Sequence, residues 1–282
     1  MEQVTLFGGT GFIGSRYKKM YPLKTIVNNR NDWRIKSPNI LYMISTVDNY
    51  NVYEDPYIDI DTNLTTLIDV LEVCRVYQTN NEDDRLIFNF ISSWFVYGNV
   101  PLPAREYALC DPKGFYSITK RTAEQLIISY CETFKLDYRI LRLGNVLGKD
   151  DKKISKKKNA LQYMINLLKE DKPVELYDGG TMVRDYIYVD DAVRAIHYLI
   201  SNDLTINNIY NIGSGVGISI REAILYAHKK LDSKSEIVNI ETKDFHKKVQ
   251  TRDMVLDIIK LRKTGYIHEF DNIYQIIDKL LD

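Results

Sequence analysis

The sequence has little cysteine and no excess of charge of either sign. Its 282 residues include only three cysteines, and Lys+Arg and Asp+Glu both number 38. The cysteines Cys74, Cys110 and Cys131 are odd in number and far apart, which excludes a disulfide scaffold and offers no close-set metal-ligand pair. We therefore expect reduced thiols, no metal site and a cytoplasmic location. Zero net charge argues against a nucleic-acid-binding protein, because phosphate neutralisation requires surplus Lys and Arg.

Long hydrophobic runs are also lacking. No stretch of about 18 apolar residues occurs, so we expect no membrane-spanning segment. Residues 1–3 lead directly into a short apolar run, without the basic residues and longer apolar stretch of a signal peptide. The remaining composition, 45% hydrophobic and 27% charged, is typical of a folded chain with a large core, and the length suggests one or two domains.

Short apolar runs alternate with longer amphipathic segments in the first half of the chain. The runs are nearly continuous, as in strands covered on both faces, and they lie at residues 3–7, 25–28, 40–44, 86–91 and 138–143. Helix-length segments lie between them at residues 12–20, 61–77 and 116–134. This alternation predicts an α/β fold in which a doubly wound parallel sheet carries helices on both faces.

The pattern changes after Gly148. Residues 150–158 are nearly all charged, which indicates either a solvated loop or a basic flap over a phosphorylated substrate. Beyond them we expect a strand at 174–177, a turn at 178–180, and helices at 160–170, 190–201, 219–231 and 272–281. The chain is thus expected to divide into a first domain, residues 1–148, and a smaller C-terminal lobe, residues 149–282.

A glycine-rich motif joins the first predicted strand to the first predicted helix. Residues 8–14 read G-G-T-G-F-I-G. Gly8 permits a tight turn, Gly11 lets the backbone approach a pyrophosphate, and Gly14 lets helix and strand pack closely. The helix N-terminus then offers free N–H groups to the anion. The motif predicts a dinucleotide-binding Rossmann domain in which the cofactor contacts Gly8, Thr10, Gly11, Phe12, Ile13 and Gly14.

The end of the second predicted strand bears on the choice of cofactor. In an NAD site an acid is expected about 20 residues after the first glycine, but this position is Asn28. Arg30 and Arg34 follow, and an arginine can pair with the 2′-phosphate of NADP. The pattern favours NADP(H), and NAD(H) stays possible because Asp32 offers a carboxylate from the same loop.

Tyr116 and Lys120 form a Y-x-x-x-K pair on one face of a predicted helix, one turn apart. A nearby ammonium lowers the pKa of a tyrosine, which makes the phenol a usable general acid/base. Ser93 stands at the end of a predicted strand, the position where ligands bind in doubly wound sheets. Its hydroxyl is placed to bond the oxygen that Tyr116 protonates or deprotonates.

Further motifs follow in order along the chain. They are Asn63 in D-T-N-L, S-S-W-F-V-Y-G at 92–98, Y-S-I-T-K at 116–120, L-R-L-G-N-V-L-G at 141–148, R-D-Y-I-Y-V-D-D at 184–191 and Y-N-I-G-S-G at 210–215. With the glycine motif they resemble the extended short-chain dehydrogenase/reductase family, the NAD(P)-dependent nucleotide-sugar epimerases, dehydratases and reductases. The likeness covers most of the chain.

The resemblance implies a role for each of several residues. Tyr116 would be the acid/base, Lys120 would bind the nicotinamide ribose and tune Tyr116, and Ser93 would hold the substrate oxygen. The nucleotide diphosphate of the sugar would be held in the C-terminal lobe, with the segment near 184–212 returning to the first domain, and its candidate contacts are Asn145, Arg184 and Arg252. The alternative for Arg184 is an ion pair with Asp185 or Asp190. Tyr97 and Asp190 are expected to be structural.

The chain departs from the family pattern at several positions. Trp94 and Phe95 follow Ser93 where the 4,6-dehydratases carry acids, so we expect no dehydration; Trp94 either packs on the sugar or belongs to the core. The third strand of the family looks shortened or absent between Asn28 and the next strand. Ser45-Thr46 replaces a common pair of alanines. Cys110 is expected to be passive, since a thiol acts as acid/base only if its pKa is lowered.

Two activities remain after these departures. The first is NADPH-dependent reduction of a nucleotide-diphospho-4-keto-6-deoxy sugar at C4, and the second is 4-epimerisation of a nucleotide sugar with tightly bound NAD. A dinucleotide-binding protein without catalysis is the least favoured interpretation, because Ser93, Tyr116 and Lys120 are all present. The family also suggests a homodimer built from the helices at 61–77 and 116–134.

Overall fold

The first domain is built on one parallel sheet. The computed structural model describes residues 3–28, 32–47, 49–152, 154–249, 251–270 and 272–282. Six strands lie in the order β2-β1-β3-β4-β5-β9, and every neighbouring pair is parallel. They are β1 (Val4–Phe7), β2 (Thr25–Val27), β3 (Asn39–Tyr42), β4 (Ile87–Ser93), β5 (Asp137–Leu143) and β9 (Asn208–Ile212). The predicted parallel α/β fold is confirmed.

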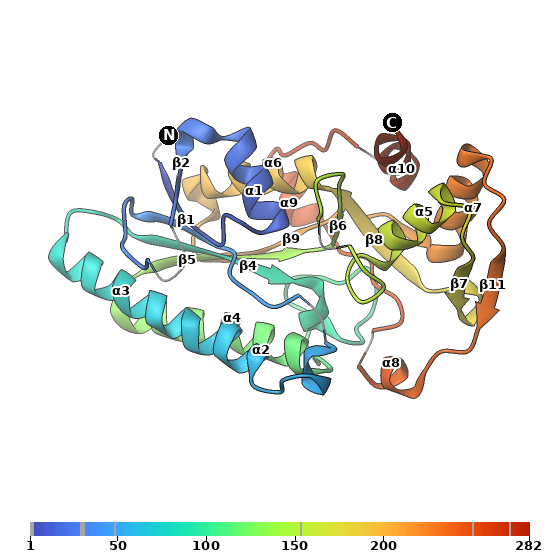
Figure 1. Ribbon diagram of the computed structural model, residues 1–282. Coiled ribbons are helices and arrows are strands. Elements are labelled where there is room, and N and C mark those ends of the chain that lie inside the picture. Colours follow the sequence, from blue (N-terminus) through green and yellow to red (C-terminus); the bar gives the residue numbers. More distant parts are fainter. Residues whose placement is uncertain (1–2, 29–31, 48, 153, 250, 271) are drawn as a thin grey trace.

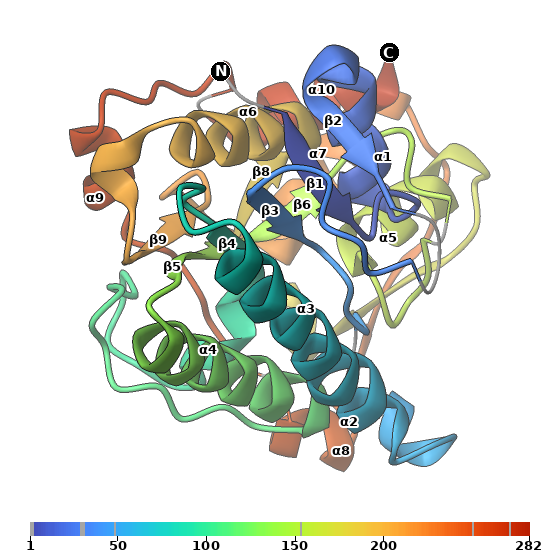
Figure 2. The ribbon, with the colours of Figure 1, turned by 90° about the vertical axis from the view of Figure 1, so that its left-hand side faces the viewer.

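Helices cover both faces of this sheet (Figures 1 and 2). Above it in Figure 1 lie α1 (Phe12–Met20) and α6 (Val189–Ile200), and below it lie α3 (Thr66–Asn80) and α4 (Phe115–Phe134). A short helix, α2 (Ile58–Ile60), and one turn of π-helix (Asp61–Thr65) lead into α3. Both central strands β1 and β4 are buried along their whole length, which explains their continuous apolar sequence.

The edge of the sheet confirms one predicted departure from the family. Strand β2 pairs only with β1 and ends the sheet on that side. Among the described residues between β2 and β3, 32–38 form no further strand. The segment is too short for the additional strand that the family carries, and β3 pairs directly with both β1 and β4.

The C-terminal lobe contains two small sheets. One consists of β6 (Asn145–Leu147), β8 (Val183–Tyr188) and β10 (Gly217–Ser219), and the other of β7 (Val174–Tyr177) and β11 (Ile237–Ile240). Its helices are α5 (Ala160–Lys169), α7 (Ile220–Leu231), α8 (Asp244–Val249) and α10 (Ile273–Leu281), whereas α9 (Ile259–Lys263) packs against β9 of the large sheet. Within the described part of the chain, no helix has both the length and the apolar character needed to cross a membrane.

The chain passes repeatedly between the two parts of the fold, first from β5 to β6. After β8, helix α6 packs against α1, and β9 pairs with β5 at the far edge of the large sheet. The chain then returns to the small sheet at β10, which pairs antiparallel with β8. An ion pair also joins α6 to α1. Asp190, at the start of α6, accepts hydrogen bonds at 2.5 and 2.6 Å from Arg16 of α1.

Candidate functional site

A cavity of about 1030 Å³ lies where β1, β4 and β5 end. Its wall combines the glycine motif, the residues that follow β4 and β5, the start of α4, and residues of the C-terminal lobe. Ligands of doubly wound sheets bind at the carboxyl ends of the strands. The cavity therefore occupies the position that the topology predicts for a binding site.

The glycine motif forms one end of the cavity, where Gly8, Gly11, Phe12, Ile13 and Gly14 contribute to the wall. Gly8 has a φ of +87°, and a Cβ atom at Gly14 would lie 2.4 Å from the Gly8 carbonyl oxygen. Gly11 caps α1 without a side-chain hydrogen bond, and no acid stands in the first turn. The free N–H groups of the helix therefore face the cavity side, as a pyrophosphate requires. Thr10 is exposed and is not part of this wall.

The predicted ribose-binding position is occupied by a structural side chain. Asn28 is buried and does not line the cavity. Its Nδ2 donates to the carbonyl oxygens of Asp32 at 2.8 Å and Arg34 at 2.9 Å, so it holds the following turn. Arg34 in turn donates from Nε to Asp32 at 2.8 Å, which balances its charge. Arg30 lies outside the described residues.

The three predicted catalytic residues lie together in the cavity wall. Ser93 is the last residue of β4, and Tyr116 and Lys120 lie on the first turns of α4. Tyr116 and Ser93 are each 8% exposed, whereas Lys120 is 2% exposed. Ser93 and Tyr116 therefore keep a small exposed surface, whereas Lys120 is more deeply buried.

Lys120 is held beneath the site by backbone and ring contacts. Its Nζ donates to the Ile91 carbonyl oxygen at 2.6 Å and lies 4.2 Å from the centroid of the Phe90 ring. Burial lowers the pKa of Lys120 to about 7, and the negative charge of Glu124 acts in the opposite direction. The charge state of Lys120 therefore depends on Glu124.

Glu124 belongs to a buried cluster that the sequence analysis missed. Arg142 of β5 donates to both carboxylate oxygens, at 2.9 and 2.7 Å, and Ser92 donates at 2.6 Å. Burial opposes ionisation, but the hydrogen bonds from Arg142 hold the pKa of Glu124 below its usual value. The signal was present in the sequence, because Glu124 continues the spacing of four that relates Tyr116 to Lys120.

A second network explains the replacement of two alanines by Ser45 and Thr46. The Asn63 Oδ1 atom accepts hydrogen bonds from the Thr46 backbone N–H at 2.9 Å and from the Ser45 hydroxyl at 3.1 Å. Its Nδ2 donates to Thr119 at 2.9 Å, one residue before Lys120. Ser45 and Thr46 line the cavity, so this network ties the cavity wall to α4.

Arg184 is a buried cation in the cavity wall. Its guanidinium donates to the carbonyl oxygens of Val183 at 2.9 Å and Thr251 at 2.8 Å, and it lies 5.2 Å from the centroid of the Trp94 ring. No ion pair among the described residues includes Arg184. The alternative of a pair with Asp185 or Asp190 is wrong.

Both of those acids have other partners. Asp185 accepts hydrogen bonds from the backbone of Ser214 at 2.7 Å and of Gly215 at 3.0 Å, and Asp190 binds Arg16. Tyr97 is buried and donates to Asn211 at 2.6 Å. Arg184 therefore lines the cavity without an ion-pair partner among the described residues, and the negative charge of Asp253 acts on it only at longer range.

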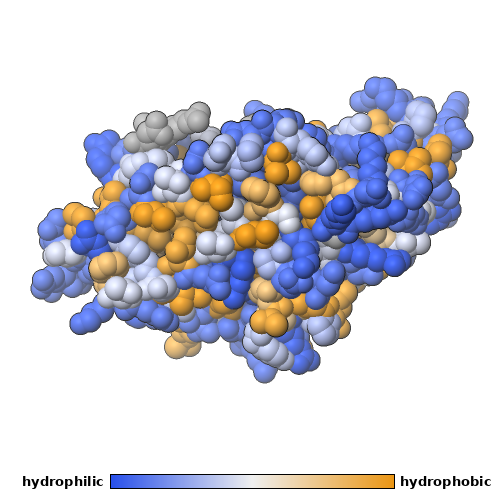
Figure 3. Space-filling model, turned by 90° about the horizontal axis from the view of Figure 1, so that it is seen from below, coloured by the Kyte–Doolittle hydropathy of each residue, from blue (hydrophilic) through white to orange (hydrophobic). Residues whose placement is uncertain are grey.

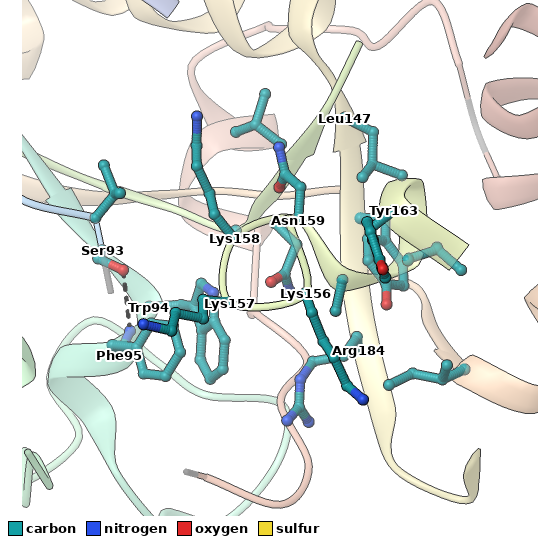
Figure 4. Close-up of a pocket in the computed structure, with 18 of the residues that line it drawn as sticks. Ser93, Trp94, Phe95, Leu147, Lys156, Lys157, Lys158, Asn159, Tyr163 and Arg184 are labelled. Carbon is teal, nitrogen blue, oxygen red and sulfur yellow. Dashed lines mark hydrogen bonds between the residues drawn. The ribbon is translucent and has the colours of Figure 1, made fainter. Parts of the chain in front are cut away.

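Three lysines near the end of the charged segment lie at the same cavity (Figure 4). Lys156, Lys157 and Lys158 all contribute to the wall. Each forms an ion pair, at 2.5, 3.1 and 2.9 Å respectively, and the partners are Glu175, Glu54 and Asp151. The segment is therefore part of the cavity rim rather than a loop directed only into solvent.

Of the other residues considered in the sequence, some lie in the cavity wall and one lies outside it. Asn145 and Arg252 line the cavity, and the Asn145 Nδ2 atom donates to the Asp185 carbonyl oxygen at 2.9 Å. Cys110 lies outside this wall, in a separate small pocket on the far side of α4. Burial raises the pKa of the Cys110 thiol, which is the opposite of what acid/base chemistry needs.

Comparison with known proteins agrees with this geometry. A dTDP-D-glucose 4,6-dehydratase from Dictyostelium discoideum is 26% identical over 85% of this chain, and the match spans 62% of that relative's own length. The UDP-glucose 4-epimerase from Thermus thermophilus, solved with NAD, has a TM-score of 0.81 at 23% identity, covering 99% of each chain. RMD from Pseudomonas aeruginosa, solved with NADPH, has a TM-score of 0.80 at 20% identity, covering 100% of this chain and 98% of its own.

These structural similarities establish the fold, and a match to a family profile establishes the family. The profile described as the NAD dependent epimerase/dehydratase family matches residues 35–213, which include Ser93, Tyr116, Lys120 and Arg184. Together with the glycine motif and the catalytic residues in one cavity, this match assigns the chain. It belongs to the NAD-dependent epimerase/dehydratase family, within the extended short-chain dehydrogenases/reductases.

Proposed function

We propose that this protein transfers a hydride between NADPH and C4 of a nucleotide-diphospho-4-keto-6-deoxy sugar, reducing the ketone to an alcohol. The observation that carries the proposal is the composition of the cavity wall. The glycine motif, Ser93, Tyr116 and Lys120 line one cavity, and two aromatic residues, Trp94 and Phe95, follow Ser93. The residues directly after Ser93 thus include no acid of the kind that a dehydration would require, and Tyr116 is the proposed acid/base group.

Each catalytic residue has a distinct task in this reaction. The dinucleotide supplies the hydride to the carbonyl carbon. The Tyr116 hydroxyl donates a proton to the C4 oxygen as the negative charge develops there, and Ser93 donates a hydrogen bond to the same oxygen. Lys120 carries a positive charge beneath Tyr116 and favours the phenolate that remains after the proton is transferred.

The carboxylates that line the described part of the cavity are too remote to add dehydration chemistry. They are Glu175 and Asp178, both in the C-terminal lobe. Glu175 pairs with Lys156 at 2.5 Å, and Asp178 accepts a hydrogen bond from the Thr242 hydroxyl at 2.8 Å. Neither lies next to Ser93 in the chain. Redox chemistry at a single carbon therefore fits the site better than elimination of water.

The substrate's nucleotide diphosphate is proposed to bind in the C-terminal lobe, residues 149–282, against Arg184 and Arg252, with Asn145 between them and the catalytic residues. The buried guanidinium of Arg184, which has no ion pair among the described residues, supports this placement, because guanidinium groups form strong bidentate hydrogen bonds with phosphates. The basic residues of the rim, Lys156 and Lys157, add positive potential at the same end of the cavity.

A second candidate is a nucleotide-sugar 4-epimerase with tightly held NAD. One observation favours it specifically, namely the pairing of Arg34 with Asp32. This pairing leaves a carboxylate in the turn after β2 and occupies the arginine that would otherwise meet a 2′-phosphate. Tyr116 would then take the C4 hydroxyl proton during oxidation and return it after the ketone has turned over in the cavity.

We also propose a homodimer in the cytoplasm. Apolar side chains are exposed along α3 and α4, among them Ile68, Val76, Ile118 and Phe134, each more than 40% exposed. The view from below shows hydrophobic residues gathered on this face (Figure 3). Pairing these helices with those of a second copy would remove this surface from water. The three free thiols are suited to a reducing compartment.

Two measurements on the purified protein test the proposal. The first is chromatographic identification of any dinucleotide released on denaturation. The second compares NADPH oxidation with dTDP-4-keto-6-deoxyglucose against interconversion of UDP-glucose and UDP-galactose without added cofactor. NADPH oxidation with no retained NAD supports the reductase. Retained NAD with sugar interconversion supports the epimerase, and the absence of both reactions contradicts both activities.

A further inference from the structure

Phe95 is placed beside the catalytic hydroxyls by the backbone itself. Ser93 is the last residue of β4, and its Oγ accepts a hydrogen bond from the Phe95 N–H at 3.3 Å, the dashed line in Figure 4. This bond turns the chain into a single 3₁₀ turn (Trp94–Tyr97). The ring of Phe95 meets the ring of Tyr116 edge to face, with centroids 5.9 Å apart. Phe95 is thus next to both groups that hold the reacting oxygen.

Trp94 fixes the Phe95 ring from behind. The two rings stack with centroids 3.9 Å apart and an interplanar angle of 23°. Trp94 is only 4% exposed, and the Arg184 guanidinium lies 5.2 Å from its centroid. A continuous column therefore runs from Arg184 through Trp94 and Phe95 to Tyr116. Phe95 is the half-buried member of the column and presents its ring to the cavity.

An aromatic ring at this point discriminates between the groups next to the reacting carbon. When Tyr116 and Ser93 hold the C4 oxygen, the neighbouring substituents are the C3 hydroxyl and the group on C5. A hydroxyl against Phe95 would lose its hydrogen bond to water and gain none, because the side chain has no polar atom. A methyl group in the same place would gain burial and dispersion contacts.

We propose that Phe95, backed by Trp94, is the residue that selects a methyl group at C5 over a hydroxymethyl or carboxylate group. The inference rests on the proposed function, since it takes C4 as the reacting carbon. It assigns the 6-deoxy preference to one side chain and makes Trp94 a positioning residue. A pocket that differs by one methyl or hydroxyl group discriminates by about 10- to 100-fold, which sets the expected size of the effect.

The experiment measures dissociation constants and, where turnover occurs, kcat/KM on the protein with its dinucleotide bound. The probes are matched pairs, UDP-6-deoxyglucose with UDP-glucose and dTDP-6-deoxyglucose with dTDP-glucose. The wild-type protein is expected to prefer the 6-deoxy member by about 10- to 100-fold. Phe95→Asn, which offers the 6-hydroxyl a partner, is expected to abolish most of this preference. Phe95→Leu keeps an apolar side chain and is expected to retain it.

Equal affinity of the wild-type protein for both members of each pair would overturn the inference, and so would an unchanged preference in Phe95→Asn. If that variant does not fold, Phe95→Tyr places a hydroxyl on the same ring and must also lower the preference. Because these probes carry a C4 hydroxyl rather than a C4 ketone, absence of turnover with them does not bear on the proposed reduction, and the ratio of dissociation constants decides the role of Phe95. The proposed function fails separately, if dTDP-4-keto-6-deoxyglucose does not cause NADPH oxidation.

Discussion

Glu124 and Arg142 form a bidentate ion pair inside the protein. The Arg142 Nε and Nη2 atoms donate to the two carboxylate oxygens at 2.9 and 2.7 Å, and both side chains are at most 1% exposed. The pair joins α4, which carries Tyr116 and Lys120, to β5, and Ser92 adds a hydrogen bond from β4. The three elements that meet at the catalytic residues are therefore joined by one carboxylate.

Glu124→Gln should destabilise the protein by about 3–5 kcal/mol, because Arg142 is left buried without its counter-charge. Urea unfolding at neutral pH measures the loss. Glu170→Gln is the matched control, since its ion pair with Lys172 is solvent-exposed and contributes little. Equal losses of stability in the two variants would show that the buried pair contributes no more to the free energy of unfolding than the exposed pair does.

Dinucleotide affinity should fall as pH rises through about 7, the pKa to which burial lowers Lys120. The ammonium is charged below this pH and neutral above it, and only the charged form attracts the cofactor. Glu124→Gln should move the fall in affinity to lower pH. Fluorescence titration across the pH range measures it. Lys120→Met should lack this transition, and a wild-type profile in that variant would refute the assignment.

Tyr116→Phe should lower kcat by about 10²- to 10⁴-fold, the usual contribution of a positioned general acid. Dinucleotide affinity should be nearly unchanged, because the ring is kept and Lys120 is untouched. Steady-state kinetics and binding titrations measure the two quantities. Tyr130→Phe, on the same helix but outside the cavity wall, is the control. Full activity in Tyr116→Phe would exclude both proposed reactions.

Arg184→Met should weaken binding of UDP and dTDP by roughly 10- to 100-fold, the equivalent of losing charged hydrogen bonds. The substitution also removes the hydrogen bonds of Arg184 to the Val183 and Thr251 carbonyl oxygens, so urea unfolding of the variant is measured beside its affinities. Isothermal titration calorimetry measures the affinities. Arg105→Met serves as control, since Arg105 pairs with Asp257 away from the cavity. Unchanged affinity in Arg184→Met would place the diphosphate elsewhere.

Asp32→Asn should raise the affinity for NADP⁺ relative to NAD⁺ several-fold. The substitution removes a carboxylate from the turn after β2 and releases Arg34, which donates to it at 2.8 Å. Parallel titrations with the two dinucleotides give the ratio. Because both charges are near the surface, the effect should shrink as salt is added. A ratio that does not change would place the adenosine ribose away from this turn.

Most of the large sheet and its helices could be predicted from the sequence. The five runs predicted as strands in the first half correspond to β1–β5, and predicted helices correspond to α1, α3 and α4. In the C-terminal lobe, β7 and α5, α6, α7 and α10 were predicted, whereas β6, β8, β9, β10 and β11 were not. Those strands are short or lie within motifs, where the alternation of apolar residues is too brief to indicate a strand.

Some residues of the candidate site lie where the sequence predicted them, and others do not. The glycines are related by short, fixed spacings, as are Tyr116 and Lys120, and together with Ser93 they line one cavity. Asn28 was placed at the cofactor by counting residues, but its amide holds a turn. The groups that surround Asn28 in the fold, rather than its distance along the chain from Gly8, determine which atoms its amide binds.

By itself, the sequence determined the features that arise from local geometry. The glycine spacing requires a strand, a tight turn and a helix, and a spacing of four places Tyr116 and Lys120 on one helix face. Only the tertiary structure decided the partners of distant residues. It joined Glu124 to Arg142, left Arg184 without a carboxylate and stacked Trp94 between Arg184 and Phe95. Pairing across elements depends on how the sheet and helices pack, and residue order alone does not specify that packing.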